Sequence, residues 1–220
     1  DISLYSLRPY TQKPDTSTNR INQYPLAIAN GILSRRFGIL AKEEGSLILS
    51  GSASRSAYFN MIEQGGIEVI PTEGKWKEAV PILEQELRKA VQFGFTEEEL
   101  KEVKANLING AEEAVKRKDT RRSDGIAMQF IGAIGERNVF TTPETDLELV
   151  KSALGKITTE DCQKAFNEFW DTKDISLVLT TPTAPESAAQ ELKKIFLKSG
   201  AAEVTPPTEK ALAPFAYTNF

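Results

Sequence analysis

Histidine is absent from this chain, and Cys162 is its only cysteine. One cysteine cannot form an internal disulfide, and zinc sites are built mainly from cysteine and histidine. The fold must therefore depend on a hydrophobic core, for which 40% hydrophobic residues is an ordinary share. A nucleophilic serine or cysteine also usually needs a histidine as its base. We therefore do not expect this chain to perform such chemistry with its own residues.

The length and net charge of the chain limit the number of domains and the class of partner. A chain of 220 residues fits one large domain or two small ones. Its net charge of −4 argues against a dedicated nucleic-acid binder. No uninterrupted apolar run approaches about 18 residues, so we expect no membrane span. The sequence starts without methionine and stops after a proline-rich tract, which is typical of a piece cut from a longer polypeptide. The compartment stays open, with bacterial periplasm and cytoplasm both compatible.

The hydrophobic pattern predicts strands near both ends of the chain and helices between them. Strands are predicted at 1–4, 47–53, 58–62, 67–70 and 174–180, and a turn or bulge at Gly65–Gly66. Helices are predicted at 19–42, 76–93, 96–115, 122–134 and 186–198, with two more beginning at Thr142 and at Thr158 or Thr159. This order favours an α+β two-layer domain in which one sheet is covered by helices.

Two local signals refine this prediction. Thr96 and Glu99 form a capping-box pattern that starts a helix, and Pro25 is expected near the start of the first helix or at a kink in it. The tetrapeptide Asp-Ile-Ser-Leu occurs at 1–4 and again at 174–177. The repeat is either a coincidence or a sign that both segments are strands of one sheet.

Several polar patterns have both a functional and a structural interpretation. Serines alternate along one predicted strand, at Ser50, Ser52, Ser54 and Ser56. They would either line a polar groove or form a solvated strand face, which is the commoner case. The acidic pairs Glu43–Glu44 and Glu112–Glu113 are poor acid–base partners, because adjacent helical residues diverge by about 100°. We expect them on the helix surface.

The only dense basic cluster comprises Lys116, Arg117, Lys118, Arg121 and Arg122. It either binds an anionic ligand or complements the dipole at a helix C-terminus, and the second interpretation is favoured. Cys162 lies on an apolar helical stripe, which predicts an inert core thiol.

Three stretches together resemble one protein family. They are 40–59, 67–87 and 94–124, which contain the runs Leu40–Gly45, Glu73–Ala79 and Gly94–Leu100. In order and spacing they resemble the pitrilysin/insulinase-type zinc metallopeptidases, the inverzincins. Within that family they resemble the second domain, which follows the zinc-bearing domain in long bacterial members. Residues 214–220 resemble the start of the linker that joins the two halves of such enzymes.

The resemblance implies a LuxS/mitochondrial-processing-peptidase-like metallohydrolase fold, with helices packed on a mostly antiparallel sheet. It implies zinc in another domain, held by a His-x-x-Glu-His motif and a distant Glu. A further domain of the family supplies an Arg and a Tyr that stabilise the transition state. The matching positions here are Ala41 and Ile48, whose side chains donate no hydrogen bond. The resemblance thus gives this chain no catalytic residue, no metal ligand and no cofactor, and it leaves the substrate-binding residues unknown.

The sequence therefore predicts a single noncatalytic domain over 1–200, with 201–220 as a linker to the following half of the parent protein. The parent is expected to be a zinc metalloendopeptidase that hydrolyses oligopeptides or unfolded proteins inside a chamber of four such domains. The expected partners are the zinc-bearing domain and the second half of the same polypeptide. Peptide substrate is a further expected partner, contacting the serine-rich strands or Arg55.

Two other functions stay open at this point. One is a protein-interaction or scaffold module of a family member that has lost catalysis. An intact His-x-x-Glu-His motif upstream would argue against that module. The other is an independent hydrolase that uses carboxylates and serine, which chelator-insensitive peptide turnover by the chain alone would support.

Overall fold

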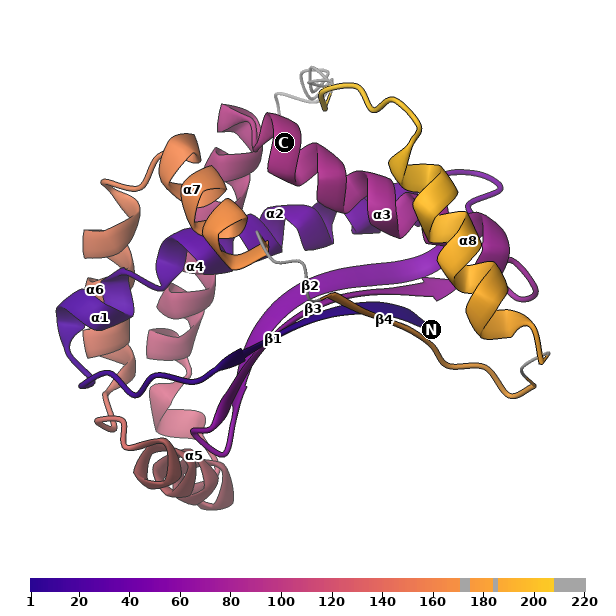
Figure 1. The fold of residues 1–220 in the computed structure, drawn as a ribbon. Coiled ribbons are helices and arrows are strands. Elements are labelled where there is room, and N and C mark those ends of the chain that lie inside the picture. The colour runs from indigo at the N-terminus through magenta and orange to yellow at the C-terminus, as the bar shows by residue number, and fades with distance from the viewer. Residues whose placement is uncertain (171–174, 184–185, 208–220) are drawn as a thin grey trace.

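The computed structural model describes residues 1–170, 175–183 and 186–207. Their central feature is a curved, four-stranded antiparallel sheet with strand order β2-β3-β1-β4. The strands are β1 Ile2–Pro9, β2 Ile48–Tyr58, β3 Ile62–Pro71 and β4 Ile175–Leu179. Helices cover the convex side of the sheet, and the concave side is open (Figure 1). The predicted α+β two-layer architecture with a mostly antiparallel sheet is confirmed.

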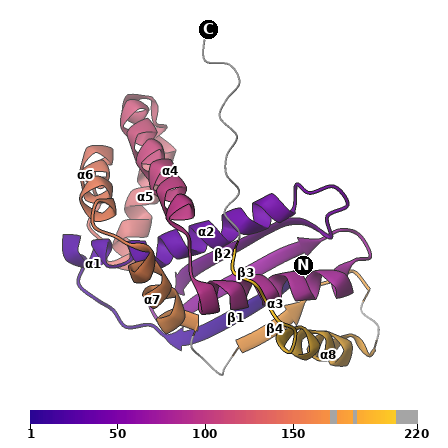
Figure 2. The same cartoon turned by 90° about the horizontal axis from the view of Figure 1, so that it is seen from above.

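The helical layer is built around α2 and α3, which lie across the sheet, with α7 packed against both (Figure 2). Helix α8 packs on α3, while α4 and α6 pack together at the other end of the domain. The helices are α1 Ser17–Ile21, α2 Tyr24–Leu40, α3 Trp76–Phe93, α4 Glu97–Lys116, α5 Ser123–Glu136, α6 Pro143–Leu154, α7 Thr159–Trp170 and α8 Ala188–Gly200, with a 3-10 turn η1 Lys118–Thr120.

The hydrophobic core lies between these two layers. It combines fully buried side chains of the sheet with those of the helices, among them Ile2, Leu4, Ile67, Phe37, Leu83 and Phe166. The alternation of the strands explains the contribution of the sheet, because every second residue of β1 and β3 points at the helices. One face of the sheet is therefore apolar and the other faces solvent.

The repeated tetrapeptide belongs to two adjacent strands. β1 pairs with β4 antiparallel, and Ile2 lies opposite Leu179 while Leu4 lies opposite Leu177. The prediction that both segments belong to one sheet is confirmed for the described residues; Asp174 lies outside them. The backbone N–H of Thr180 also donates to the Asp1 carbonyl at 2.9 Å and extends this pairing.

The helix predicted over 19–42 is wrong in one respect, because the segment forms two helices. α1 ends at Ile21, and α2 starts at Tyr24 with Pro25 in its first turn. Proline has no N–H to donate and is best tolerated in the first turn, where the helix has no partner for one. Pro25 therefore marks a helix start here rather than a kink.

The prediction for residues 47–70 is also wrong, because two long strands replace three short ones. The chain reverses at Phe59 and Asn60, both of which have positive φ, and Met61 N–H donates to the Tyr58 carbonyl at 3.0 Å. Three residues, 59–61, therefore connect the paired Tyr58 and Ile62 in a tight hairpin turn. Gly65 and Gly66 lie inside β3 and form no turn.

The glycine pair has a packing role. A Cβ atom on Gly65 would lie 2.1 Å from the Phe169 ring, so only glycine allows α7 to approach the sheet this closely. The sequence predicted a turn or bulge at this pair, whereas in the structure Gly65 matters because it has no side chain.

The predicted linker at 201–220 is described only up to residue 207. Residues 203–207 have no regular secondary structure, and Val204 is buried against the domain. Residues 208–220 lie outside the described part of the chain. The division into a domain over 1–200 and a linker after it stays a prediction.

Candidate functional site

The concave face of the sheet is the part of the domain that its own helices leave open (Figure 1). On β2, Gly51 faces the helices, since a Cβ atom there would lie 2.7 Å from the Phe37 ring. Ala53 shares that side, where its N–H donates to Ser34 Oγ at 2.9 Å. The residues between and beyond them therefore point at the concave face, and these are Ser50, Ser52, Ser54 and Ser56.

A row of three residues crosses the middle of this face. Tyr5 of β1 and Ser54 of β2 both lie opposite Gly66 of the intervening β3. A Cβ atom on Gly66 would lie 3.4 Å from the Tyr5 ring and 3.5 Å from Ser54 Oγ, so the ring and the hydroxyl close over the glycine. By the same alternation Tyr58 of β2 and Glu68 of β3 point to this side, so the face presents hydroxyl groups, aromatic rings and a carboxylate.

The structure does not bring Arg55 together with the serines. Arg55 points to the helical side, where its Nη1 donates to Gln23 Oε1 at 3.4 Å. Its guanidinium also forms an ion pair with Glu63 of the neighbouring strand. The hypothesis that Arg55 contacts substrate beside the serines therefore loses its geometric basis, because neighbouring strand residues face opposite sides.

The two positions that match the catalytic Arg and Tyr of the resembling family carry no polar side chain. Ala41 is the last residue of the turn that ends α2, and its N–H donates to the Phe37 carbonyl. Ile48 begins β2 and is 1% exposed, with its side chain in the core. Neither position offers a donor to a developing oxyanion.

The acidic pairs do not form an acid–base site. A general acid needs a raised pKa, whereas each described carboxyl group whose pKa is shifted has it lowered. The Lys151 ammonium, which hydrogen-bonds Glu112, lowers the pKa of that carboxyl, and Lys116 does the same for Glu113. Glu43 and Glu44 lie exposed in the turn after α2. Glu112 and Glu113 thus lie on a helix surface, as expected, whereas Glu43 and Glu44 lie in a surface turn and not on a helix.

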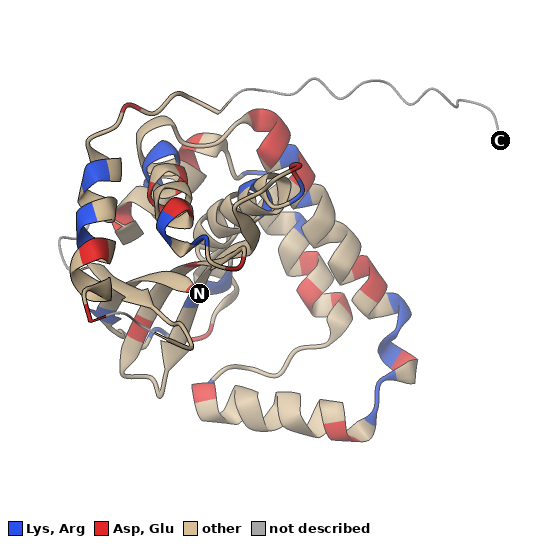
Figure 3. Ribbon diagram, turned by 90° about the vertical axis from the view of Figure 1, so that its right-hand side faces the viewer, with Lys and Arg blue, Asp and Glu red and all other residues tan. Residues whose placement is uncertain are grey.

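The basic cluster lies where α4 ends and η1 follows, and Figure 3 shows its blue segments between α4 and α5. Most of its charges have internal partners: Lys116 with Glu113 at 2.8 Å, Lys118 with Glu144, and Arg122 with Asp124 at 2.9 Å. Lys116 occupies the last turn of α4, where a cation complements the helix dipole. The geometry favours this role over an anion-binding site.

Cys162 is a core residue, as predicted. It is 0% exposed on α7, and burial raises the pKa of its thiol to about 12. In the described part of the chain, His, Cys, Asp and Glu side chains form no group of three or more that could hold a metal ion. Among the same residues, the helices are too short or too polar to cross a bilayer.

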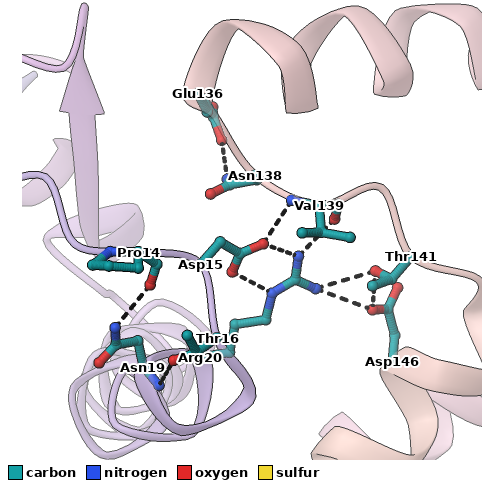
Figure 4. A network of polar contacts seen from close by, with 10 residues as sticks. All are labelled: Pro14, Asp15, Thr16, Asn19, Arg20, Glu136, Asn138, Val139, Thr141 and Asp146. Carbon is teal, nitrogen blue, oxygen red and sulfur yellow. Dashed lines mark hydrogen bonds and ion pairs between the residues drawn. The ribbon is translucent and has the colours of Figure 1, made fainter.

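One polar network joins segments that are far apart in the sequence (Figure 4). The Arg20 guanidinium donates to both Asp15 carboxylate oxygens at 2.7 and 2.5 Å and to the Val139 carbonyl at 2.7 Å. Asp15 in turn accepts from the Val139 N–H at 2.7 Å. The network fixes the segment between α5 and α6 to the loop before α1. Sequence reasoning missed it, since nothing local signals a contact across more than a hundred residues.

No sequence family and no curated protein sequence matches this chain. Solved structures do match. The first half of the periplasmic protease PqqL from Escherichia coli matches with a TM-score of 0.82 at 18% identity, over 94% of this chain and 45% of that one. A predicted insulinase family protease from Yersinia pestis matches with a TM-score of 0.74 at 14% identity, over 91% and 43%. A peptidase M16 inactive domain from Pseudomonas fluorescens matches with 0.55 at 16% identity, over 84% and 42%.

This chain has the fold of a pitrilysin/insulinase-type peptidase domain. The resemblance drawn from the sequence is thereby confirmed at the level of the fold. The matched peptidase structures include one described as an inactive domain, and this chain spans less than half the length of each of the three.

Proposed function

We propose that this chain is a noncatalytic domain of a longer zinc metalloendopeptidase and that its concave sheet face forms part of the wall of the substrate chamber. The observation that carries the proposal is the open face itself. It combines exposed serine hydroxyls with a backbone surface. Ala41 and Ile48, which match the family's catalytic Arg and Tyr, are apolar and lie outside it. Such a face can hold an extended peptide loosely without cleaving it.

The chemistry of the face fits a variable peptide. Serine hydroxyls donate and accept hydrogen bonds and rotate to suit a partner, so they accommodate many sequences. Apolar side chains share the face, since Leu7 is 52% and Ile62 is 45% exposed on neighbouring strands. A mixed surface of this kind favours unfolded segments, which expose both backbone and apolar groups. Zinc would be held elsewhere in the polypeptide, because this chain lacks the ligands that zinc prefers.

The test is made on the polypeptide that contains this chain. We expect its sequence to carry a His-x-x-Glu-His motif outside these 220 residues and the purified protein to cleave unfolded peptides in a chelator-sensitive way. Substitution of the motif glutamate should abolish cleavage, because that side chain activates the zinc-bound water. A polypeptide with no such motif and no cleavage would overturn the proposal and favour an interaction module.

A further inference from the structure

Helix α5 carries a packing stripe that the rest of the described chain leaves uncovered. Ala127, Phe130, Ile131 and Ile134 follow the i, i+3, i+4, i+7 spacing of one helix face. Phe130 is 50%, Ile131 61% and Ile134 63% exposed. No residue of α5 is buried, and the helix is uncharged from Gly125 to Gly135 (Figure 3). A stripe of this kind is normally buried against another element.

Little of the domain packs on α5. Phe130 meets the ring of Phe140, just past the helix, with ring centroids 5.5 Å apart, and is still 50% exposed. An open hollow of about 390 Å³ separates α5 from α4 and is lined by Gly110 and Ala114 of α4 and by Gln129 of α5. Polar contacts fix the C-terminal end of α5. Asn60 Nδ2 donates to the Gly135 carbonyl at 3.1 Å, and Asp15 and Arg20 hold Val139 just beyond the helix. Helix α5 is therefore held in position while most of its apolar stripe stays exposed.

The β2–β3 turn extends this surface. Its contact through Asn60 brings it beside the end of α5, and its neighbours Phe59 and Met61 are 90% and 70% exposed. Phe59 also has a φ of 53°, a conformation in which glycine or asparagine is preferred to a bulky residue. Neither core packing nor backbone preference explains a phenylalanine at this position.

Together these side chains form what we term the α5–hairpin surface, defined by Phe59, Met61, Met128, Phe130, Ile131 and Ile134. At about 200 Å² for a fully exposed side chain of this size, the six present roughly 800 Å² of apolar area. The largest apolar patch of a typical monomer is about 300–600 Å², and one partner in a standard interface contributes about 800 Å². The surface therefore has the size of an interface.

We propose that the α5–hairpin surface docks another domain of the same longer polypeptide, through an apolar face on that domain. The inference rests on the proposed function, because it takes the neighbour from the parent chain. The matched PqqL half and the Yersinia protein are more than twice as long as the part that this chain covers. Arg121 and Arg137 flank α5, and neither forms an ion pair within the described residues. The docked domain would place carboxylates opposite them.

Cysteine labelling tests the proposal directly, because buried Cys162 gives no background. Ile131→Cys is compared in the isolated chain and in the longer polypeptide, with Lys101→Cys on the exposed side of α4 as the matched control. We expect maleimide to react with the Ile131→Cys variant at least tenfold more slowly in the longer polypeptide and with the control at equal rates. Equal rates for both variants, or equal slowing of both, would overturn the docking.

The same labelling assay on the isolated chain also tests whether something else covers the α5–hairpin surface. If labelling slows as protein concentration rises and sedimentation shows a dimer, a second copy covers the surface and the proposal is wrong. If vesicles of phosphatidylcholine and phosphatidylglycerol slow labelling, the surface binds membranes and the proposal is equally wrong. Peptide cleavage by the longer polypeptide is measured in parallel. An active zinc peptidase with unprotected Ile131→Cys refutes only the docking, whereas protection in a polypeptide without the zinc motif refutes only the peptidase assignment.

Discussion

Arg36 and Glu99 join α2 to the first turn of α4 through two parallel contacts. Arg36 Nε lies 2.7 Å from Oε1 of Glu99, and Nη2 lies 2.8 Å from Oε2. The two side chains are 7% and 14% exposed. The same carboxylate accepts the N–H of Thr96 at 2.9 Å and completes the predicted capping box. One carboxylate thus starts α4 and fixes the helix that leads to α5.

Glu99→Ala should destabilise the domain strongly. It removes half of a buried ion pair and leaves the Arg36 guanidinium with fewer partners, which costs about 3–5 kcal/mol when a charge is left buried. It also removes the side-chain half of the capping box, worth about 1 kcal/mol. Urea unfolding followed by circular dichroism measures the loss.

The matched control is the neighbouring pair on the same two helices. Arg35 Nε lies 2.5 Å from Glu102 Oε1, but these side chains are 33% and 42% exposed. Glu102→Ala should therefore cost only about 0–1 kcal/mol. Losses of similar size in the two variants would contradict the role given to Glu99.

Gly65→Ala should destabilise the contact between α7 and the sheet. The added methyl group would meet the Phe169 ring at 2.1 Å, and overpacking of this kind costs about 1–3 kcal/mol. Adding Phe169→Leu should recover part of the loss by making room. Gly110→Ala, in open space on α4, should instead raise stability by up to about 1 kcal/mol. The explanation fails if the Phe169→Leu change recovers nothing.

Asp15 should give the domain a pH-dependent contribution to stability. Its hydrogen bond from Arg20 lowers its pKa below the usual 3.8. A lowered folded-state pKa means that the contribution is complete above the unfolded value and is lost as pH falls through the lower folded value. The stability difference between wild type and Asp15→Asn should thus be constant above about pH 5 and shrink below pH 4. Asp146→Asn, 3.6 Å from Arg20 and 52% exposed, should show a smaller effect.

Ser52→Lys should change substrate preference in the longer polypeptide if the concave face lines a chamber. A lysine there would lie opposite Glu68 of β3 and offset its negative charge. This should disfavour basic unfolded peptides and favour acidic ones by about fivefold, the size of one partly screened charge interaction. Competition between two labelled peptides of opposite charge measures the ratio. Ser152→Lys places the same charge on exposed α6 and should leave the ratio unchanged. An unchanged ratio in the Ser52 variant would remove the chamber role.

Phe59→Gly should stabilise the isolated chain while weakening the α5–hairpin surface. Glycine removes the cost of a left-handed backbone, which is about 1–2 kcal/mol for other residues. Phe59→Ala keeps that backbone cost and should give no gain. Thermal unfolding of the two variants measures the difference, and equal midpoints would show that the turn is unstrained.

The sequence could predict the elements whose signals are local. The capping box at Thr96 and Glu99 and the helix start at Thr142 each follow from a few neighbouring residues. The turn or bulge predicted at Gly65–Gly66 was wrong because Gly65 makes room for the Phe169 ring, which lies about a hundred residues away in the sequence. The turn at Phe59 was not predicted, because phenylalanine is not a residue that such turns favour.

The candidate site was predictable in composition but not in geometry. Alternating serines on one strand are visible in the sequence, and the structure places them on the open face. Arg55 looked like their neighbour, yet alternation turns it to the other side. A helix was predicted at 122–134, but only the fold shows that most of its apolar stripe stays exposed in the described chain. Burial is a property of tertiary packing, which local patterns do not report.

Metal content and peptide cleavage of the purified 220-residue chain test the central claim most directly. The account predicts that zinc-loaded and dialysed protein retains far less than one zinc per chain and leaves an unfolded peptide panel intact. One tightly held zinc per chain, together with cleavage that a chelator stops, would contradict it.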